Sequence, residues 1–203
     1  MPGERGHFVN SGIVTSSKEM LIIDTQLSAE YGRRLGLRAK YLDKHLKAIY
    51  ISHGHGDHTW GTKDLLKVFL GTPVFASQET INKMIKDSPE WLDPKLFRPF
   101  SNNVGAPGKI IIPQLWNEST IELDGELAHL LPPGRVSCPS KEIWIENAKK
   151  ARDHVKTNNR SIVPGHLGNS RKWTEDEMLE FPVKYVETYN EALKENTTDK
   201  VLG

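Results

Sequence analysis

The chain has 203 residues, enough to bury a hydrophobic core without disulfide bonds, and we expect one domain over residues 1–203. Lysine and arginine total 27 against 26 aspartates and glutamates, which argues against nucleic acid or an anionic membrane as partner. A single cysteine, Cys138, excludes an internal disulfide framework and a thiolate zinc cluster within one chain. Because the sequence shows neither a signal peptide nor a run of roughly 20 apolar residues, we expect a cytoplasmic protein.

The first elements in chain order indicate an α/β fold. Short apolar runs at 11–14 and 20–23 predict two strands joined by a hairpin turn, and Asp24 ends the second strand. From 28 to about 45, leucine and tyrosine recur at helical spacing among basic residues, which predicts an amphipathic helix. The apolar run 48–51 then predicts a buried strand. In such layered α/β domains, the loops at strand ends usually carry the chemistry.

A cluster of chemically versatile side chains follows this strand directly. Three histidines and an aspartate lie within six residues: His53, His55, Asp57 and His58. The interleaved Gly54 and Gly56 are expected to let the backbone turn sharply so that the side chains converge. Imidazole and carboxylate donors together suit zinc, iron or manganese, and we expect zinc. The alternative is a solvated histidine-rich turn without a metal.

The alternation of helices and strands continues beyond the histidines. Residues 62–69 predict a short helix, 72–76 a strand, and 77–86 a second helix with Ser77 as its N-cap. Several prolines and a Ser-Asn-Asn run in residues 87–108 predict a long loop with one possible helical turn. Long loops inside compact domains are often functional lids.

The last part of the chain predicts a second layer of strands and two more helices. Three strands are expected, at 109–113, 119–123 and 126–131. The last two meet at Asp124-Gly125, a strong signal for a two-residue hairpin. Apolar spacing predicts a helix over 140–156 and a short strand at 161–163, and residues 174–177 form a capping box that opens a C-terminal helix.

Three segments, in this order along the chain, resemble those of one known superfamily. One segment reads Ser52-His53-Gly54-His55-Gly56-Asp57-His58-Thr59-Trp60-Gly61. It resembles the HxHxDH signature of the metallo-β-lactamase superfamily. The earlier Leu21-Ile22-Ile23-Asp24-Thr25 resembles the strand that ends in an aspartate before that signature, and Ile162-Val163-Pro164-Gly165-His166 resembles the late Pro-Gly-His element. The resemblance implies an αββα sandwich.

The same resemblance implies a site and an activity. His53 and His55 would bind a first metal, and Asp57, His58 and His166 a second, so that one or two ions, zinc first, are expected. Asp57 would also orient the attacking water. Asp24 would support the metal-binding residues without binding the metal itself. The implied function is metal-dependent hydrolysis of an ester, thioester, amide or lactam-type bond in a small-molecule substrate.

The sequence departs from the family pattern in its second half. Where a further Pro-Gly-His step is expected, the chain reads Pro132-Pro133-Gly134-Arg135, and arginine cannot ligate a cation. The segment that normally carries two strands and a bridging aspartate is missing after Gly134, so we expect a sandwich that is incomplete in its second half. Asp153, in an ordinary solvated helix face, and His129, in a strand, are weak replacements.

Two functions from different classes therefore stay open. The intact early signature favours a hydrolase whose site holds one metal, or two of which one is weakly bound. Arg135 and the missing aspartate favour a catalytically impaired or inactive scaffold or binding protein. A nuclease is disfavoured by the near-neutral charge. The substrate depends on loops such as 87–108, and the sequence does not settle the oligomeric state.

Overall fold

In the computed structural model, residues 9–93, 95 and 108–130 are described, together with isolated residues between 146 and 188. The chain divides into two compact units. The first comprises Met1–Pro133 with Gly165–Gly168, and the second Gly134–Pro164 with Asn169–Gly203. Each unit is treated by itself below, and the expectation of one domain over 1–203 stays a prediction.

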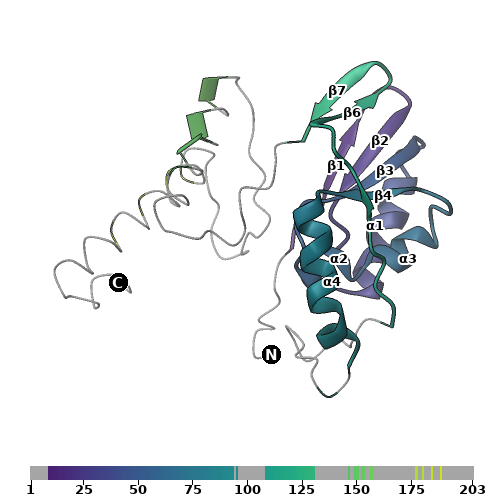
Figure 1. Cartoon of the computed structure of the whole chain (residues 1–203). Helices are drawn as coiled ribbons and strands as arrows, with labels where there is room; N and C mark the ends of the chain where they lie inside the picture. The colour runs from purple at the N-terminus through teal and green to yellow at the C-terminus, as the bar shows by residue number, and fades with distance from the viewer. Residues whose placement is uncertain are drawn as a thin grey trace, which may run out of the picture. The chain divides into compact units, whose positions relative to one another are not determined.

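A five-stranded sheet forms the centre of the first unit, with strand order β1-β2-β3-β4-β5 (Figure 1). Its strands are β1 Gly12–Thr15, β2 Glu19–Ile23, β3 His45–Ile51, β4 Val74–Ala76 and β5 Gln114–Leu115. β1 and β2 form the expected antiparallel hairpin, and β2, β3, β4 and β5 pair in parallel. Parallel pairing requires a crossover between successive strands, and helices provide these crossovers.

Four helices connect the parallel strands: α1 Ala29–Lys40, α2 Gly56–Thr59, α3 Thr62–Leu66 and α4 Gln78–Leu92. Ser28 caps α1 by accepting the Tyr31 N–H, and Ser77 caps α4 by accepting the Thr80 N–H. Buried residues of α1, α3 and α4 (Ala39, Leu65, Ile81 and Met84) join the same core cluster as Met20, Ile22, Ile49 and Ile51 of the sheet. The helices therefore cover one face of the sheet.

The side chains of β2 and β3 alternate between two cores. In β2, Met20 and Ile22 face the helical core, whereas Leu21 belongs to a second cluster with Ala48 and Tyr50 of β3. The pairing register shifts between Met20 and Leu21, opposite Lys47. This irregularity restores the alternation, because a one-residue slip would otherwise turn the following apolar side chains to the wrong face.

The hairpin of β6 Thr120–Leu123 and β7 Glu126–His129 covers the other face of the sheet. Ile121 and Leu123 of β6 are buried in the second cluster. The expected turn is confirmed, because Asp124 and Gly125 both adopt positive φ, 50° and 86°. Figure 1 shows this hairpin beside β1 and β2. Within the described residues, the second sheet consists of these two strands.

Three predicted helix boundaries were wrong, and the first is the helix expected over 62–69, which ends at Leu66. The helix expected to run to about residue 45 ends at Lys40, and β3 already begins at His45. The helix expected over 77–86 continues to Leu92, through the start of the predicted long loop. Pro89 lacks the N–H that would bond the Ile85 carbonyl, and the Ser88 hydroxyl donates to that carbonyl instead. The extra turn also packs Trp91 edge-on against Trp60.

The strand predicted at 109–113 was also wrong, because strand pairing begins only at Gln114. Ile110 and Ile111 instead pack against the helical core, which accounts for the apolar run. Pro113 has no N–H to donate to a ladder. An apolar run can thus be buried without pairing as a strand.

In the second unit, every described residue is helical: 146, 149, 150, 152, 153, 156, 157, 177, 180, 184 and 188. This agrees with the two helices predicted there. Asp153 is 65% exposed and accepts a hydrogen bond from Arg152, as expected for a solvated helix face. The strand at 161–163, the capping box at 174–177 apart from residue 177, and the segment after Gly134 lie outside the described residues.

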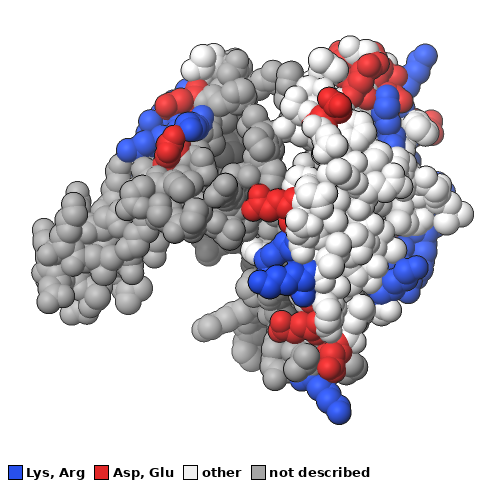
Figure 2. All heavy atoms as spheres, viewed as in Figure 1, with Lys and Arg blue, Asp and Glu red and all other residues white. Residues whose placement is uncertain are grey.

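Two surface properties bear on partners. On the face of the first unit seen in Figure 2, basic and acidic side chains lie interspersed around a largely uncharged area. Among the described residues, no helix has the length and apolar character needed to cross a membrane.

Candidate metal centre

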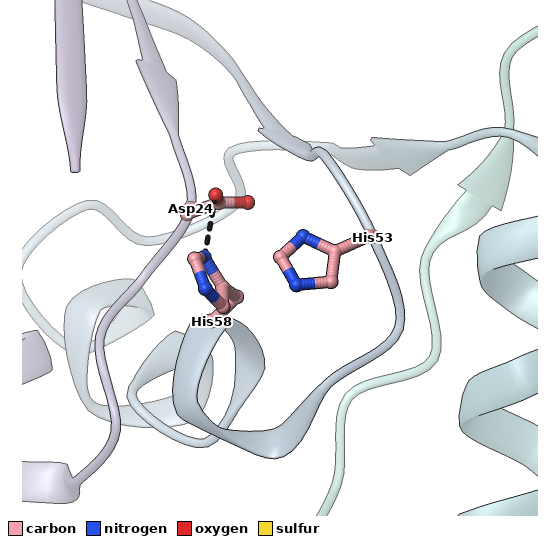
Figure 3. A group of neighbouring side chains, drawn as sticks. All are labelled: Asp24, His53 and His58. Carbon is pink, nitrogen blue, oxygen red and sulfur yellow. Dashed lines mark hydrogen bonds and ion pairs between the residues drawn. The ribbon is translucent and has the colours of Figure 1, made fainter. Parts of the chain in front are cut away.

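The site lies where the parallel strands β2 and β3 end. Asp24 follows β2, His53 lies in the loop after β3, and His58 belongs to the short helix α2 (Figure 3). Because parallel strands end at the same edge of a sheet, residues distant in sequence meet there. One potential ligand atom from each of the three residues lies within 4.8 Å of the other two.

Asp24 is the centre of a buried hydrogen-bond network. Its Oδ2 accepts from His58 Nδ1 at 2.7 Å and from the Ser52 hydroxyl at 2.7 Å, and its Oδ1 accepts the Ser52 N–H at 2.8 Å. The residue is only 5% exposed and has a positive φ of 62°, a conformation that aspartate tolerates better than most residues. The carboxylate of Asp24 thus fixes the orientation of Ser52 and His58.

The backbone of His58 is held as firmly as its ring. The His58 carbonyl accepts from the Thr25 N–H at 2.8 Å and from the Thr25 hydroxyl at 3.0 Å. The Thr25 hydroxyl also lies 2.8 Å from the buried Thr62 hydroxyl, which lies 2.6 Å from the Thr59 carbonyl, so the two hydroxyl hydrogens are shared among these three contacts. These contacts fix α2 against the end of β2, so that His58 enters the site from a rigid support.

His55 and Asp57 lie beside members of this group but are not part of the set whose ligand atoms lie within 4.8 Å of one another. The ring centroid of His53 lies 4.1 Å from that of His58 and 4.7 Å from that of His55. Asp57 is buried, and its Oδ2 lies 3.6 Å from His58 Nε2. The structure therefore brings two of the four early residues, His53 and His58, together with Asp24, and it places His55 next to His53 and Asp57 next to His58.

Loss of solvation favours the neutral form of two of these imidazoles, although His55 is exposed. Loss of solvation, together with the neighbouring His58, lowers the pKa of His53 to about 4. Burial likewise lowers the pKa of His55. A neutral imidazole offers a lone pair, which is the form that binds a metal ion.

The glycines of the motif serve a purpose other than the expected one. Among the described residues, the glycines with positive φ are Gly71 and Gly125, so neither Gly54 nor Gly56 makes a left-handed turn. A Cβ on Gly56 would lie 2.1 Å from the Trp60 ring, and one on Gly54 would lie 2.7 Å from the Lys83 side chain. These positions need glycine because other chain segments pass too close for a side chain.

Some predicted residues lie outside the part that the structure describes. His166 and Arg135 are not described, and His129 is placed only by its backbone, opposite Thr120 in the hairpin. Sequence reasoning missed Ser52 and Thr25, which hold the histidines. Ser52 precedes the motif directly, but hydroxyl residues are so common at strand ends that no local signal marks its role.

The model of the metallo-beta-lactamase superfamily matches residues 5–149, which is well over half of the chain. The chain belongs to the metallo-β-lactamase superfamily. No curated protein matches the chain significantly.

Solved structures agree with this family at low sequence identity. The metallo-β-lactamase DIM-1, exposed to ceftazidime, is 18% identical with a TM-score of 0.58, and the match covers 89% of this chain and 85% of that one. A double mutant of the sec-alkyl sulfatase PisA1 is 15% identical with a TM-score of 0.61, covering 92% of this chain and 40% of the sulfatase. These likenesses establish the fold.

A third structure gives a partial match. The subclass B3 metallo-β-lactamase MEM-A1, isolated from a soil metagenome library, is 18% identical with a TM-score of 0.42. The match covers 60% of this chain and 45% of MEM-A1. The chain thus spans less than half the length of MEM-A1 and of the sulfatase.

The donor set of this superfamily member fits a metal ion. The imidazoles of His53 and His58 converge beside the buried Asp24, and carboxylate–histidine pairs of the Asp24–His58 kind are the usual support of metal-binding histidines. The superfamily usually binds metal ions, and this site offers the nitrogen and oxygen ligands that zinc accepts.

Proposed function

We propose that the protein is a metal-dependent hydrolase of small molecules. The observation that carries this proposal is the 2.7 Å bond from His58 Nδ1 to the buried Asp24 carboxylate, beside the rings of His53 and His55. This bond uses His58 Nδ1, so Nε2, which lies 3.6 Å from Asp57 Oδ2, is the nitrogen that would bind an ion. A buried carboxylate and a buried histidine cost stability, which favours a functional purpose for the pair.

The proposed ligands are those of the sequence analysis. His53 and His55 would hold one ion, and Asp57, His58 and His166 another, with zinc proposed first and iron or manganese as alternatives. When bound, zinc lowers the pKa of a coordinated water to about 7 and polarises the scissile bond. Without the ligand that Arg135 replaces, a single well-held ion is the favoured stoichiometry.

Asp57 is the proposed catalytic residue. Its carboxylate is buried at the start of α2, and its Oδ2 lies 3.6 Å from His58 Nε2. At this place a carboxylate oxygen can accept a hydrogen bond from the attacking water and hold the water in line with the substrate. The adjacent Asp24 network keeps His58, and therefore this corner of the site, from moving.

The bond that is cleaved is proposed only by class. DIM-1 is a lactamase and PisA1 an alkyl sulfatase, so the shared fold accommodates different leaving groups. We propose an ester, thioester, amide or lactam substrate, a cytoplasmic location and no nucleic-acid partner.

The decisive experiment measures bound metal and turnover together. Untagged protein is analysed by plasma mass spectrometry and assayed against a chromogenic cephalosporin, an aryl ester, a thioester, a phosphodiester and an alkyl sulfate. We expect about one zinc per chain and hydrolysis of at least one substrate that is lost in His58→Ala and Asp57→Ala. His45→Ala is the matched control, because His45 is an exposed histidine at the start of β3, the strand that precedes the motif. Activity that survives both site substitutions would contradict the proposal.

The second candidate is a catalytically impaired scaffold or binding protein of the same superfamily. The sequence Pro132-Pro133-Gly134-Arg135 favours it, since arginine stands where a ligand is expected and we expect the segment with the bridging aspartate to be missing. In this case the folded protein carries no metal, or carries a metal without turnover of any substrate in the panel. Turnover that tracks the metal content would exclude it.

A further inference from the structure

Ser52 lies between the two halves of the site. Its hydroxyl oxygen is 2.7 Å from Asp24 Oδ2 on one side and 2.9 Å from His53 Nδ1 on the other. The same Asp24 oxygen accepts from His58 Nδ1. One carboxylate therefore contacts His58 directly and His53 through a single hydroxyl group (Figure 3 shows the two rings and the carboxylate).

A count of hydrogens decides the direction of each bond. A serine hydroxyl has one hydrogen, and a carboxylate can only accept. If Ser52 gave its hydrogen to His53, two oxygens with lone pairs would face each other at 2.7 Å, at a cost to the fold. Ser52 must therefore donate to Asp24, and its oxygen must accept from His53, so His53 carries its proton on Nδ1.

We propose that Ser52 is a positioning residue that extends the control of Asp24 to His53, so that one carboxylate sets the tautomers of two metal-binding histidines. Both rings then carry their proton on Nδ1 and present the lone pair of Nε2. This inference rests on the proposed function, because it assigns to Ser52 a role in preparing ligands. The second ring nitrogen of a metal-binding histidine commonly bonds a carboxylate or carbonyl, and here a hydroxyl links the two.

Backbone contacts of Ser52 do not depend on its hydroxyl, so the role of the hydroxyl can be tested by itself. The Ser52 N–H donates to Asp24 Oδ1 at 2.8 Å, and the Ser52 carbonyl accepts from the Thr80 hydroxyl. Ser52→Ala keeps both contacts and removes the hydroxyl, and with it the bonds to Asp24 Oδ2 and to His53 Nδ1. Ser52→Thr restores a hydroxyl at the same position and is the conservative control.

The first measurement is the tautomer of each histidine in the metal-free protein, read from imidazole ¹⁵N shifts and couplings at neutral pH. We expect the Nδ1–H form for His53 and His58 in the native chain and in Ser52→Thr. In Ser52→Ala, His53 should lose this fixed form while His58 keeps it, because His58 bonds Asp24 directly. A native His53 that carries its proton on Nε2, or an unchanged His53 in Ser52→Ala, would overturn the proposal.

The second measurement is zinc affinity by competition with a chromophoric chelator. Ser52→Ala should bind zinc about 10- to 100-fold more weakly, as is typical when a supporting contact of a ligand is lost, and Ser52→Thr should bind near the native level. Equal affinity in Ser52→Ala and native protein would overturn the role in metal binding. If the native chain binds no zinc, the proposed function fails, whereas the tautomers still report whether Ser52 links Asp24 to His53.

Discussion

Two aspartates at opposite ends of β2 hold different parts of the fold together. Asp24 follows the strand, is buried, and accepts bonds from the side chains of Ser52 and His58. Asp124, in the β6–β7 turn, is exposed and accepts from the hydroxyls of Ser16 and Ser17 and from the N–H groups of Lys18 and Glu19. Both residues have positive φ, 62° and 50°.

The difference shows how the environment decides what a carboxylate does. Asp124 binds the turn before β2 in contact with water, and so joins the hairpin to the first sheet without burying a charge. Asp24 is taken out of water, where each bond is stronger and an unmade bond costs more. The buried carboxylate is therefore the one that can fix the geometry of a site, and the exposed one holds surface segments together.

The largest effect on stability is expected inside the hairpin. Ile121 is 3% exposed and packs in the cluster beneath the first sheet. Ile121→Ala should lower the free energy of unfolding by about 2 to 5 kcal/mol, because it leaves a cavity in a packed core. Denaturant unfolding measures the loss.

The control for this substitution lies on the same hairpin. Leu127 is 56% exposed, and Leu127→Ala should change stability by about 0.5 kcal/mol or less. Equal losses in the two variants would show that the hairpin does not pack on the sheet as described. Zinc bound per folded Ile121→Ala chain should stay unchanged, which separates the hairpin from the site.

Asp24→Asn tests the role of the buried carboxylate, the first of the two aspartates compared above. The asparagine keeps the shape and tolerates the left-handed backbone, but it is neutral and has one accepting oxygen in place of two. We expect zinc affinity to fall about 10- to 100-fold in competition titrations. Asp43→Asn is the matched control, since Asp43 also has positive φ but is exposed and outside the site. Similar affinities of the two variants would refute the role given to Asp24.

Gly56→Ala tests whether close packing supports the site. The added Cβ would meet Trp60 ring atoms at 2.1 to 2.4 Å, so α2 or the indole must move. We expect a loss of about 1 to 3 kcal/mol in unfolding free energy, together with weaker zinc binding. Gly108→Ala is the control, because its nearest contact is Lys63 Nζ at 4.0 Å. A Gly56→Ala protein as stable as Gly108→Ala would contradict the close approach.

The smallest effect is expected at Asp124, and it depends on pH. Hydrogen bonds from Ser16 and from the backbone of Lys18 hold the pKa of Asp124 well below its ordinary value. A lowered folded-state pKa contributes stability that is fully present above the unfolded value of about 3.9 and is lost as pH falls below it. Unfolding of native protein and Asp124→Asn, compared from pH 2 to 7, should show a difference that shrinks only in acid. A difference independent of pH would contradict this account.

Local sequence patterns predicted much of the first unit. The β1–β2 hairpin, α1, β3 and the Asp124-Gly125 turn follow from apolar spacing and turn chemistry, which act between near neighbours in the chain. The boundaries that were wrong depended on distant packing. α4 continues to Leu92 with Trp91 packed on Trp60, and Ile110 and Ile111 pack against the helical core without joining a sheet.

For the site, the sequence by itself determined which donor side chains are available, because His53, His55, Asp57 and His58 lie close together in the chain and their residue types suit metal binding. Only the tertiary structure decided how they are held. Asp24 reaches His58 across 34 positions, and Asp124 reaches Ser16 across 108. Such bonds form only when the sheet brings strand ends together, so no local sequence pattern predicts them. The role of Ser52 likewise follows from its place between Asp24 and His53.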